Sequence, residues 1–173
     1  MRVRALVLAM LGVLAAAPAV AAAPAAPPIT LRLLGSGEAF DSRALIGKKF
    51  LVVRFQASWC KVCIAEAPGF ERAYAGYRDR AVEFLGVQVQ DTEADARRFL
   101  EAHHATYPAG LDPRLRTANR FGFRGTPYTV VIDRQGKMAA RLHGSADEAR
   151  IRRALDPLLQ PRPARKAPPR RLQ

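Results

Sequence analysis

The sequence predicts an α/β protein, because apolar, strand-like runs alternate with segments of helical pattern along most of the chain. Residues 50–55, 81–89 and 128–132 are rich in the β-branched and aromatic residues that favour strands. The last run is followed by a turn and a second strand, which is the pattern of a hairpin, and then by a final helix. With 173 residues, 49% of them hydrophobic and 25% charged, the chain fits one globular domain with extensions.

The elements are placed from apolar spacing, turn residues and caps. Asp91 or Thr92 is expected to cap a helix whose first turn holds Glu93 and Asp95, as the helix dipole prefers. The expected order is strand 29–34, turn 35–37, strand 50–55, helix from 59 or 60 to about 77, strand 81–89, helix to about 103, strand 107–111, helix 113–120, strand 128–132, strand 137–143 and helix 147–159.

Both ends of the chain differ in composition from this domain. Residues 1–22 have a basic start at Arg2 and Arg4, an apolar stretch and a small-x-small pattern at Ala19 and Ala21, which are typical of a secretory signal peptide. An uncleaved membrane anchor is the alternative, although prolines interrupt a run that would just reach the ~20 residues of a span. The expected domains are then a proline- and alanine-rich linker at 23–28, the folded domain at 29–159 and a disordered, basic, proline- and arginine-rich tail at 160–173.

The formal net charge is +13, and removal of Arg2 and Arg4 with the signal peptide leaves 13 − 2 = +11. A charge of this size influences association more than folding. The sequence has no RNA-binding signature and no phosphate-binding loop, and residues 35–37 form a turn too short for a dinucleotide fingerprint, so no nucleic-acid partner is expected. The basic tail is expected to be dispensable for chemistry. Its attraction to an anionic membrane surface or an acidic partner is the alternative.

The two cysteines, Cys60 and Cys63, are separated by only two residues. A disulfide that closes so short a loop adds little stability, so a structural role explains the pair poorly even in an exported protein. The strand at 50–55 is expected to deliver Cys60 to the amino terminus of the next helix, where unpaired backbone amides stabilise a thiolate. Cys63 follows one turn later, placed to attack the Cys60 sulfur. The pair is therefore predicted to be redox-active.

The residues around this pair resemble the thioredoxin superfamily, and in particular its exported TlpA/ResA-like branch of thiol–disulfide oxidoreductases. The resemblance covers about residues 29–159 and is carried by Gly47-Lys48, Trp59-Cys60-x-x-Cys63-x-x-Glu66-x-Pro68, Gly125-Thr126-Pro127 and residues 131–136 in combination. It implies a thioredoxin-like fold, with a central mixed β-sheet flanked by helices. It also implies that the Thr126–Pro127 bond is cis and faces the cysteines, that the backbone of Thr126 holds the substrate as an added strand, and that Trp59 flanks the active site.

The same resemblance implies a mechanism in which Cys60 attacks a disulfide of a client protein and Cys63 resolves the mixed disulfide. Members of this branch mostly act as reductants, often in cytochrome c maturation, and a membrane-embedded electron donor of the transmembrane disulfide reductase type re-reduces them. The expected location is therefore periplasmic or otherwise extracytoplasmic. No cofactor is expected, and no metal, because no further ligand is spaced near the cysteines.

Two positions depart from the family pattern. Lys61-Val62 replaces the proline-containing pair that is common between such cysteines, which leaves the redox potential open. Arg54 stands six residues before Cys60, where thioredoxin has a buried acid, and its stem is expected to pack inside while its charged head reaches the surface. Because arginine cannot be a base, Glu66 is predicted to be the proton-handling acid, three residues after Cys63 on the same side of the helix. The alternative is that Glu66 only complements the helix dipole or pairs with Arg54. The pKa of Glu66 is expected to be raised by burial unless Arg54 lies close enough to cancel that effect.

Two other functions remain open from the sequence. A pair of exported thiolates can hold Cu(I), which soft sulfur ligands favour, and the protein would then be a binding module. A peroxiredoxin-like thiol peroxidase would share the fold, but it is disfavoured because the nucleophile lies in Cys-x-x-Cys directly after Trp59. Thiol–disulfide exchange is the function that the sequence favours.

Overall fold

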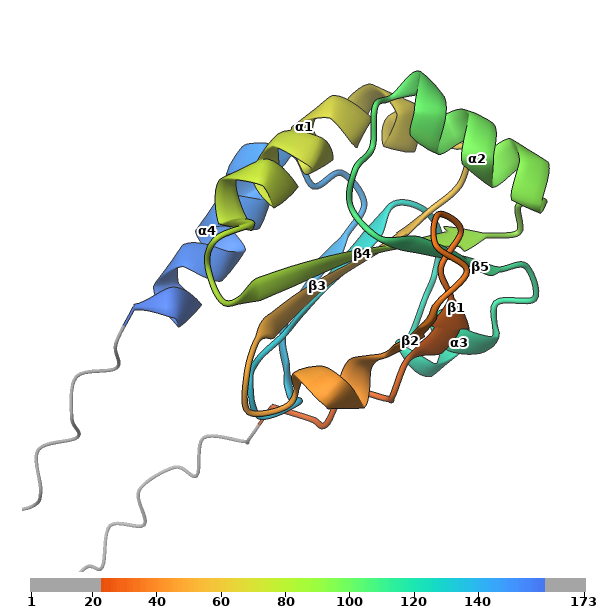
Figure 1. Ribbon diagram of the computed structural model, residues 1–173. Coiled ribbons are helices and arrows are strands. Elements are labelled where there is room, and N and C mark those ends of the chain that lie inside the picture. Colours follow the sequence, from red (N-terminus) through yellow and green to blue (C-terminus); the bar gives the residue numbers. More distant parts are fainter. Residues whose placement is uncertain (1–22, 161–173) are drawn as a thin grey trace, which may run out of the picture.

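The computed structural model describes residues 23–160, so the predicted signal peptide and all but the first residue of the predicted tail lie outside the described residues. The centre of the fold is a five-stranded sheet in the order β5-β4-β3-β6-β7 (Figure 1). β3, β4 and β5 are parallel, whereas β6 is antiparallel to β3 and β7 to β6, so the predicted mixed sheet is confirmed. The strands are β3 Phe50–Gln56, β4 Val82–Val89, β5 Ala109–Asp112, β6 Tyr128–Ile132 and β7 Met138–His143.

The helices α1, α2 and α4 lie on one face of the sheet, and α3 lies on the other with the N-terminal hairpin of β1 and β2 (Figure 1). α1 and α2 share a face because β3-α1-β4 and β4-α2-β5 step across the sheet in the same direction, and right-handed crossovers then place both helices on one side. The remaining elements are β1 Thr30–Arg32, β2 Ala39–Asp41, the 3-10 helix η1 Ser42–Leu45, α1 Lys61–Tyr77, α2 Glu93–Ala102, α3 Arg116–Arg120 and α4 Glu148–Leu159.

Alternation along β3 divides the core into two layers. Val52 and its cross-strand neighbours Phe84 and Val131 point to the face covered by α1 and pack with Phe70 of that helix. Phe55 points to the opposite face, where its layer also includes residues of α3 and of the N-terminal segment. Since both faces are covered, every residue of β3 is buried, which is why this strand is a nearly continuous apolar run in the sequence.

The short elements are where the structure differs from the expectations. β2 and η1 were not predicted, because segments of three or four residues are too short to show a period. The helix expected at 113–120 begins only at Arg116, since Leu115 before it adopts a left-handed conformation with φ of 56°. In the segment expected to be a linker, the Ala26 amide donates to the Gly136 carbonyl at 2.8 Å, so this segment is hydrogen-bonded to the domain. None of the helices within residues 23–160 is long and apolar enough to cross a membrane.

Candidate active site

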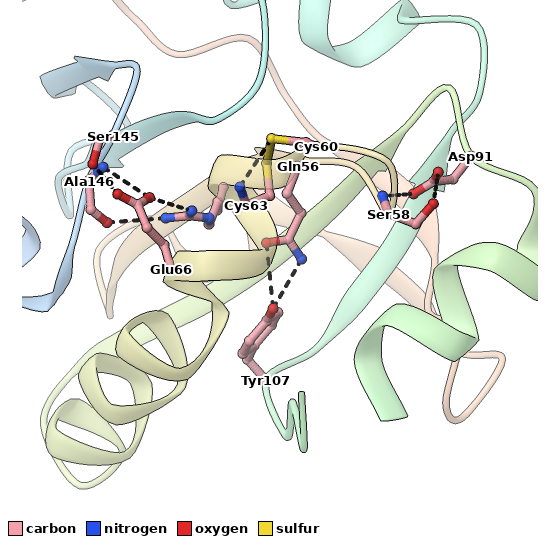
Figure 2. Close-up of a disulfide and its surroundings, with 10 residues drawn as sticks. Gln56, Ser58, Cys60, Cys63, Glu66, Asp91, Tyr107, Ser145 and Ala146 are labelled. Carbon is pink, nitrogen blue, oxygen red and sulfur yellow. Dashed lines mark hydrogen bonds and ion pairs between the residues drawn. A yellow bond between two sulfur atoms is a disulfide. The ribbon is translucent and has the colours of Figure 1, made fainter. Parts of the chain in front are cut away.

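Cys60 and Cys63 lie at the amino terminus of α1 and form a disulfide, with their Cα atoms 5.1 Å apart (Figure 2). β3 ends at Gln56, and the turn that follows makes Cys60 the N-cap residue of α1. The Cys63 amide donates a hydrogen bond to the Cys60 sulfur at 3.1 Å. Cys60 retains 6% exposure, whereas Cys63 is fully buried. Cys60 is therefore the sulfur that a partner can reach, and the helix amides stabilise its thiolate.

The loop before Cys60 is held by Asp91, which the sequence suggested only as a helix cap. The buried Asp91 carboxylate accepts hydrogen bonds from the Ser58 amide at 2.9 Å and the Ser58 hydroxyl at 2.7 Å (Figure 2). The cap of α2 is Thr92 instead. β3 and β4 are parallel, so their carboxyl ends meet at one edge of the sheet. An aspartate two residues after the end of β4 was thus the available signal for a residue near the cysteines.

The Thr126–Pro127 bond is cis, which confirms that prediction, and Pro127 is buried. The next residue, Tyr128, pairs with Phe55 of β3, so the cis bond lies beside the end of β3 that leads to Cys60. Aromatic packing holds this loop, because the Phe55 and Tyr128 rings stack with centroids 5.7 Å apart. Thr126 is partly exposed, so the predicted substrate-binding segment is accessible from solvent.

Apolar side chains are exposed around the cysteines. Of the four large hydrophobic side chains that are exposed within residues 23–160, three belong to this short segment: Trp59, Val62 and Ile64. Trp59 is 57% exposed, more than any of the others. Exposed apolar side chains near the reachable sulfur are available for contact with another molecule. The structure thus places Trp59 beside the reachable cysteine, together with Val62, for which the sequence suggested no role.

Glu66 is held by three hydrogen-bond donors on the inner side of α1 (Figure 2). Arg54 Nη2 donates to its Oε2 at 2.7 Å, the Ala146 amide donates to the same oxygen at 3.1 Å, and the Ser145 hydroxyl donates to Oε1. Burial acts to raise the pKa of Glu66, but the bonds from Ser145, Arg54 and Ala146 outweigh it and hold the pKa below its usual value. The expected rise in the pKa of Glu66 is therefore absent: the Ser145 hydroxyl has the largest lowering effect, and Arg54, which lies close as that expectation allowed, and the Ala146 amide add to it.

The guanidinium of Arg54 does not reach the surface, so that expectation was wrong. The residue is fully buried, Nη1 donates to the Ala146 carbonyl at 3.1 Å, and the guanidinium lies over the Phe70 ring, 5.1 Å from its centroid. The physical reason is that the loop before α4 supplies an acceptor inside the fold and Glu66 supplies the opposite charge. Paired and hydrogen-bonded in this way, a buried cation is tolerated.

Arg54 belongs to a buried polar layer under the amino-terminal half of α1. Thr129 on β6 is its cross-strand neighbour, and Gln56, two residues further along β3, is the neighbour of Gln88 on β4. Gln56 Nε2 donates to the Tyr107 hydroxyl at 3.0 Å (Figure 2), and burial raises the pKa of Tyr107 to about 12. Within the part of the chain that the structure describes, the buried side-chain polar atoms that lack a partner are Arg54 Nε, both amide atoms of Gln88 and Thr129 Oγ1.

A family model described as the AhpC/TSA family matches residues 22–141. The chain belongs to the AhpC/TSA family. Among curated relatives of this AhpC/TSA protein, the thiol:disulfide interchange protein HelX of Rhodobacter capsulatus is 33% identical over 145 residues, which cover 83% of this chain and 80% of HelX. The thiol-disulfide oxidoreductase ResA of Halalkalibacterium halodurans is 26% identical over 125 residues, which cover 72% and 70% of the two chains.

The fold has close counterparts among solved structures. The crystal structure of a thiol:disulfide interchange protein of the thioredoxin family from Chlorobium tepidum matches with a TM-score of 0.73 and 24% identity, covering 82% of this chain and 100% of that one. The thioredoxin-like fold is therefore confirmed. With the HelX and ResA relatives, this AhpC/TSA protein is a thiol–disulfide oxidoreductase of the ResA-like branch. Residues 23–160 contain no group of three or more histidine, cysteine or acidic side chains arranged to hold a metal ion.

Proposed function

We propose that this thiol–disulfide oxidoreductase is exported and reduces disulfides in client proteins. The observation that carries the proposal is the asymmetry of the cysteine pair. Cys60 accepts an amide hydrogen bond at a helix terminus and is reachable, whereas Cys63 is buried behind it. A reachable, stabilised thiolate backed by a second thiol is what an exchange reaction requires.

The proposed reaction transfers two electrons from the dithiol to the client. The Cys60 thiolate attacks one sulfur of the client disulfide, a mixed disulfide forms, and the other client sulfur leaves as a thiolate. Cys63 then loses its proton and attacks the Cys60 sulfur, which releases the second client thiolate and leaves the Cys60–Cys63 disulfide. That disulfide is the form that the structure contains.

The exposed apolar side chains and the cis-proline loop are the proposed client-binding surface. Trp59 and Val62 would cover the apolar residues next to the client cysteine, because their side chains are already exposed to solvent at the reachable sulfur. The backbone of Thr126, directly before Pro127, would hold the client as an added strand. This arrangement binds extended segments and tolerates different side chains.

Glu66 is the proposed proton-handling residue for the second step. Its lowered pKa keeps it as a carboxylate at neutral pH, which is the form that accepts a proton. It lies one helical turn from Cys63, the thiol that must be deprotonated. The ion pair with Arg54 makes Glu66 a weak base, so the proton would rest on it only transiently before reaching solvent.

Export, the electron donor and the client class are proposed from the sequence. The residues of the predicted signal peptide precede the domain, and a membrane-embedded donor of the transmembrane disulfide reductase type would re-reduce the pair. Apocytochrome c is the first client to test, because the resembling branch often serves cytochrome c maturation. Cell fractionation and amino-terminal sequencing of the mature protein test export. A cytoplasmic, uncleaved chain would contradict it.

The mixed disulfide provides the direct test of the exchange reaction. A Cys63→Ala variant expressed in its native host should accumulate mixed disulfides through Cys60, and mass spectrometry should identify the clients. The matched control is Cys60→Ala, which should trap nothing because Cys63 is buried. Pulse alkylation of the reduced protein at different pH values should also show Cys60 titrating below the ~8.5 of a free thiol. If Cys63 is alkylated faster than Cys60, then Cys63 is the attacking cysteine and Cys60 the resolving one.

The redox potential decides the direction of the reaction. A potential of about −270 mV is expected for a reductant, whereas a value of about −120 mV would make the protein a strong oxidant. Copper stoichiometry of the reduced protein, measured beside insulin reduction, tests the copper-binding alternative. If the reduced protein binds Cu(I) tightly and stoichiometrically but does not reduce insulin, its function is metal binding rather than disulfide exchange.

A further inference from the structure

A groove with four exposed arginines lies between β1, β5 and α3. It has a volume of about 750 Å³, and its charged rim is formed by Arg32, Arg114, Arg116 and Arg120. Leu31 and Leu111 contribute apolar lining. The groove is thus a concave, positively charged surface with an apolar component.

Some arginines of the described domain pair with carboxylates, whereas the four of this groove do not. On α2, Arg97 pairs with Glu93 and Arg98 with Asp95, and Arg152 of α4 pairs with Glu148. Within residues 23–160, no ion pair joins any of the four groove arginines to a carboxylate. The positive charge of the groove is therefore not compensated by the domain itself.

The acidic residue nearest to this groove does not neutralise it. Asp112 is buried, and its Oδ2 accepts hydrogen bonds from the amides of Thr117 and Ala118 at 2.9 and 2.8 Å. This carboxylate therefore interacts with the start of α3 and not with the arginines of the groove. Residues 113–132 contain four arginines and no aspartate or glutamate, and this segment leads from the groove to Pro127. An uncompensated positive charge of this kind attracts a negatively charged partner.

The groove opens at the same edge of the sheet as the cysteines. β3, β4 and β5 are parallel, so their carboxyl ends lie together. The Gln90 amide donates to the Asp112 carbonyl at 3.4 Å, and the adjacent Asp91 holds Ser58, two residues before Cys60. A segment bound in the groove therefore lies at the same edge of the sheet as the reachable sulfur.

We propose that this groove binds an acidic segment that flanks the disulfide of the client protein. The inference rests on the proposed function and adds the client's chemical class. A concave groove with apolar lining fits an extended polypeptide better than it fits the surface of an anionic bilayer. Opposite charges at the rim would increase the encounter rate and align the client disulfide with Cys60, and salt would weaken both effects.

The test uses two peptides that contain the same disulfide and differ only in a flanking run, of glutamates in one and of glutamines in the other. The rate constant of reduction by the reduced protein is measured for each. The acidic peptide should react about tenfold faster at low salt, and the ratio should approach one at high salt. The Arg116→Gln/Arg120→Gln variant should lose this preference. The matched control, Lys48→Gln/Arg153→Gln, removes the same charge from exposed residues outside the groove and should keep it.

Binding is measured separately, so that a failure of the groove can be distinguished from a failure of the exchange reaction. A fluorescent acidic peptide without cysteines is titrated with the oxidised protein and with both variants. Binding that is lost in Arg116→Gln/Arg120→Gln but kept in the control supports the groove even if no peptide is reduced. Equal binding by all three proteins overturns the proposal. Binding to phosphatidylserine vesicles through the same arginines, with no affinity for the acidic peptide, also overturns it and assigns the groove to a membrane.

Discussion

The face of the sheet beneath α1 has two ends of opposite character. At the end far from the cysteines, β3, β4 and β6 present only apolar side chains, such as Val52, Phe84 and Val131. Two positions closer to the cysteines, the side chains at the same face are Arg54 of β3 and Thr129 of β6. They are followed by Gln56 of β3 and Gln88 of β4. Both ends are buried to the same degree. The change from apolar to polar side chains is therefore not explained by a difference in solvent exposure.

This difference shows that the apolar end stabilises the domain and that the polar end lowers its stability. Burial of a large apolar side chain contributes about 1.5–3 kcal/mol. A buried polar atom without a partner costs about 1–3 kcal/mol, and the polar end holds four such atoms on three residues. A sequence selected for stability alone would continue the apolar pattern to the end of β3. The polar end instead lies under the amino-terminal half of α1, where Arg54 pairs with Glu66.

Removal of an aromatic side chain from the apolar end is expected to give the largest loss of stability. Phe84 packs edge-on against Phe70, with ring centroids 5.4 Å apart, and is fully buried. Phe84→Ala should lower the free energy of unfolding by about 3–5 kcal/mol because it leaves a cavity. The pH profile of Cys60 alkylation in the folded variant should match that of wild type. A shifted profile would mean that the two ends are coupled. Urea unfolding and pulse alkylation measure the two quantities.

Removal of the buried cation from the polar end should cost almost as much. Arg54→Met leaves the Glu66 carboxylate without its opposite charge and should lower the free energy of unfolding by about 3 kcal/mol. The double variant Arg54→Met/Glu66→Gln removes both charges and should recover most of that loss. Urea unfolding of the two single variants and the double variant forms a complete cycle. A double variant that is no more stable than Arg54→Met would show that the ion pair is not the reason for the loss.

The polar end also marks the limit of what the sequence predicted. The five strands of the sheet, the cysteine pair and the cis bond before Pro127 were predictable, because each depends on a local pattern or on a motif with fixed spacing. The burial of Arg54 was not predictable, because its acceptor on Ala146 lies 92 residues further along the chain. The contact between Asp91 and Ser58 spans 33 residues and was missed for the same reason. A periodic sequence pattern does not indicate contacts between residues so far apart in the chain.

Replacement of Glu66 should have a smaller effect on stability and a clear effect on rate. Glu66→Gln leaves Arg54 with a neutral acceptor, which should cost about 1–3 kcal/mol at neutral pH. Because the pKa of Glu66 is depressed in the folded state, its contribution is present above the ordinary value and is lost as the pH falls through the folded value. Wild type should therefore lose stability below about pH 4.5, and the variant should lose less there. Urea unfolding across acid pH measures this difference.

The same variant tests the proton-handling role. Resolution of the mixed disulfide, followed by stopped-flow fluorescence, should be at least about tenfold slower in Glu66→Gln than in wild type at neutral pH. Glu101→Gln is the matched control, because Glu101 is an exposed glutamate on α2, and its rate should equal that of wild type. If wild type and Glu66→Gln give superimposable pH–rate profiles, solvent handles the proton and Glu66 serves only to hold Arg54.

The smallest expected effect is at Tyr107, where the polar layer meets the aromatic core. Tyr107→Phe removes the hydroxyl that accepts from Gln56, while its ring still packs on Phe70, so the loss should be about 1 kcal/mol. Burial raises the pKa of Tyr107 from 10.0 to about 12, so between these values the folded state keeps a proton that the unfolded chain has released. Stability must therefore fall as the pH rises through this window. The variant should show a shallower fall, but part of the slope should remain because the pKa of Tyr77 is also raised to about 12. Urea unfolding at alkaline pH measures both slopes, and equal slopes in wild type and variant would show that Tyr107 does not titrate with unfolding.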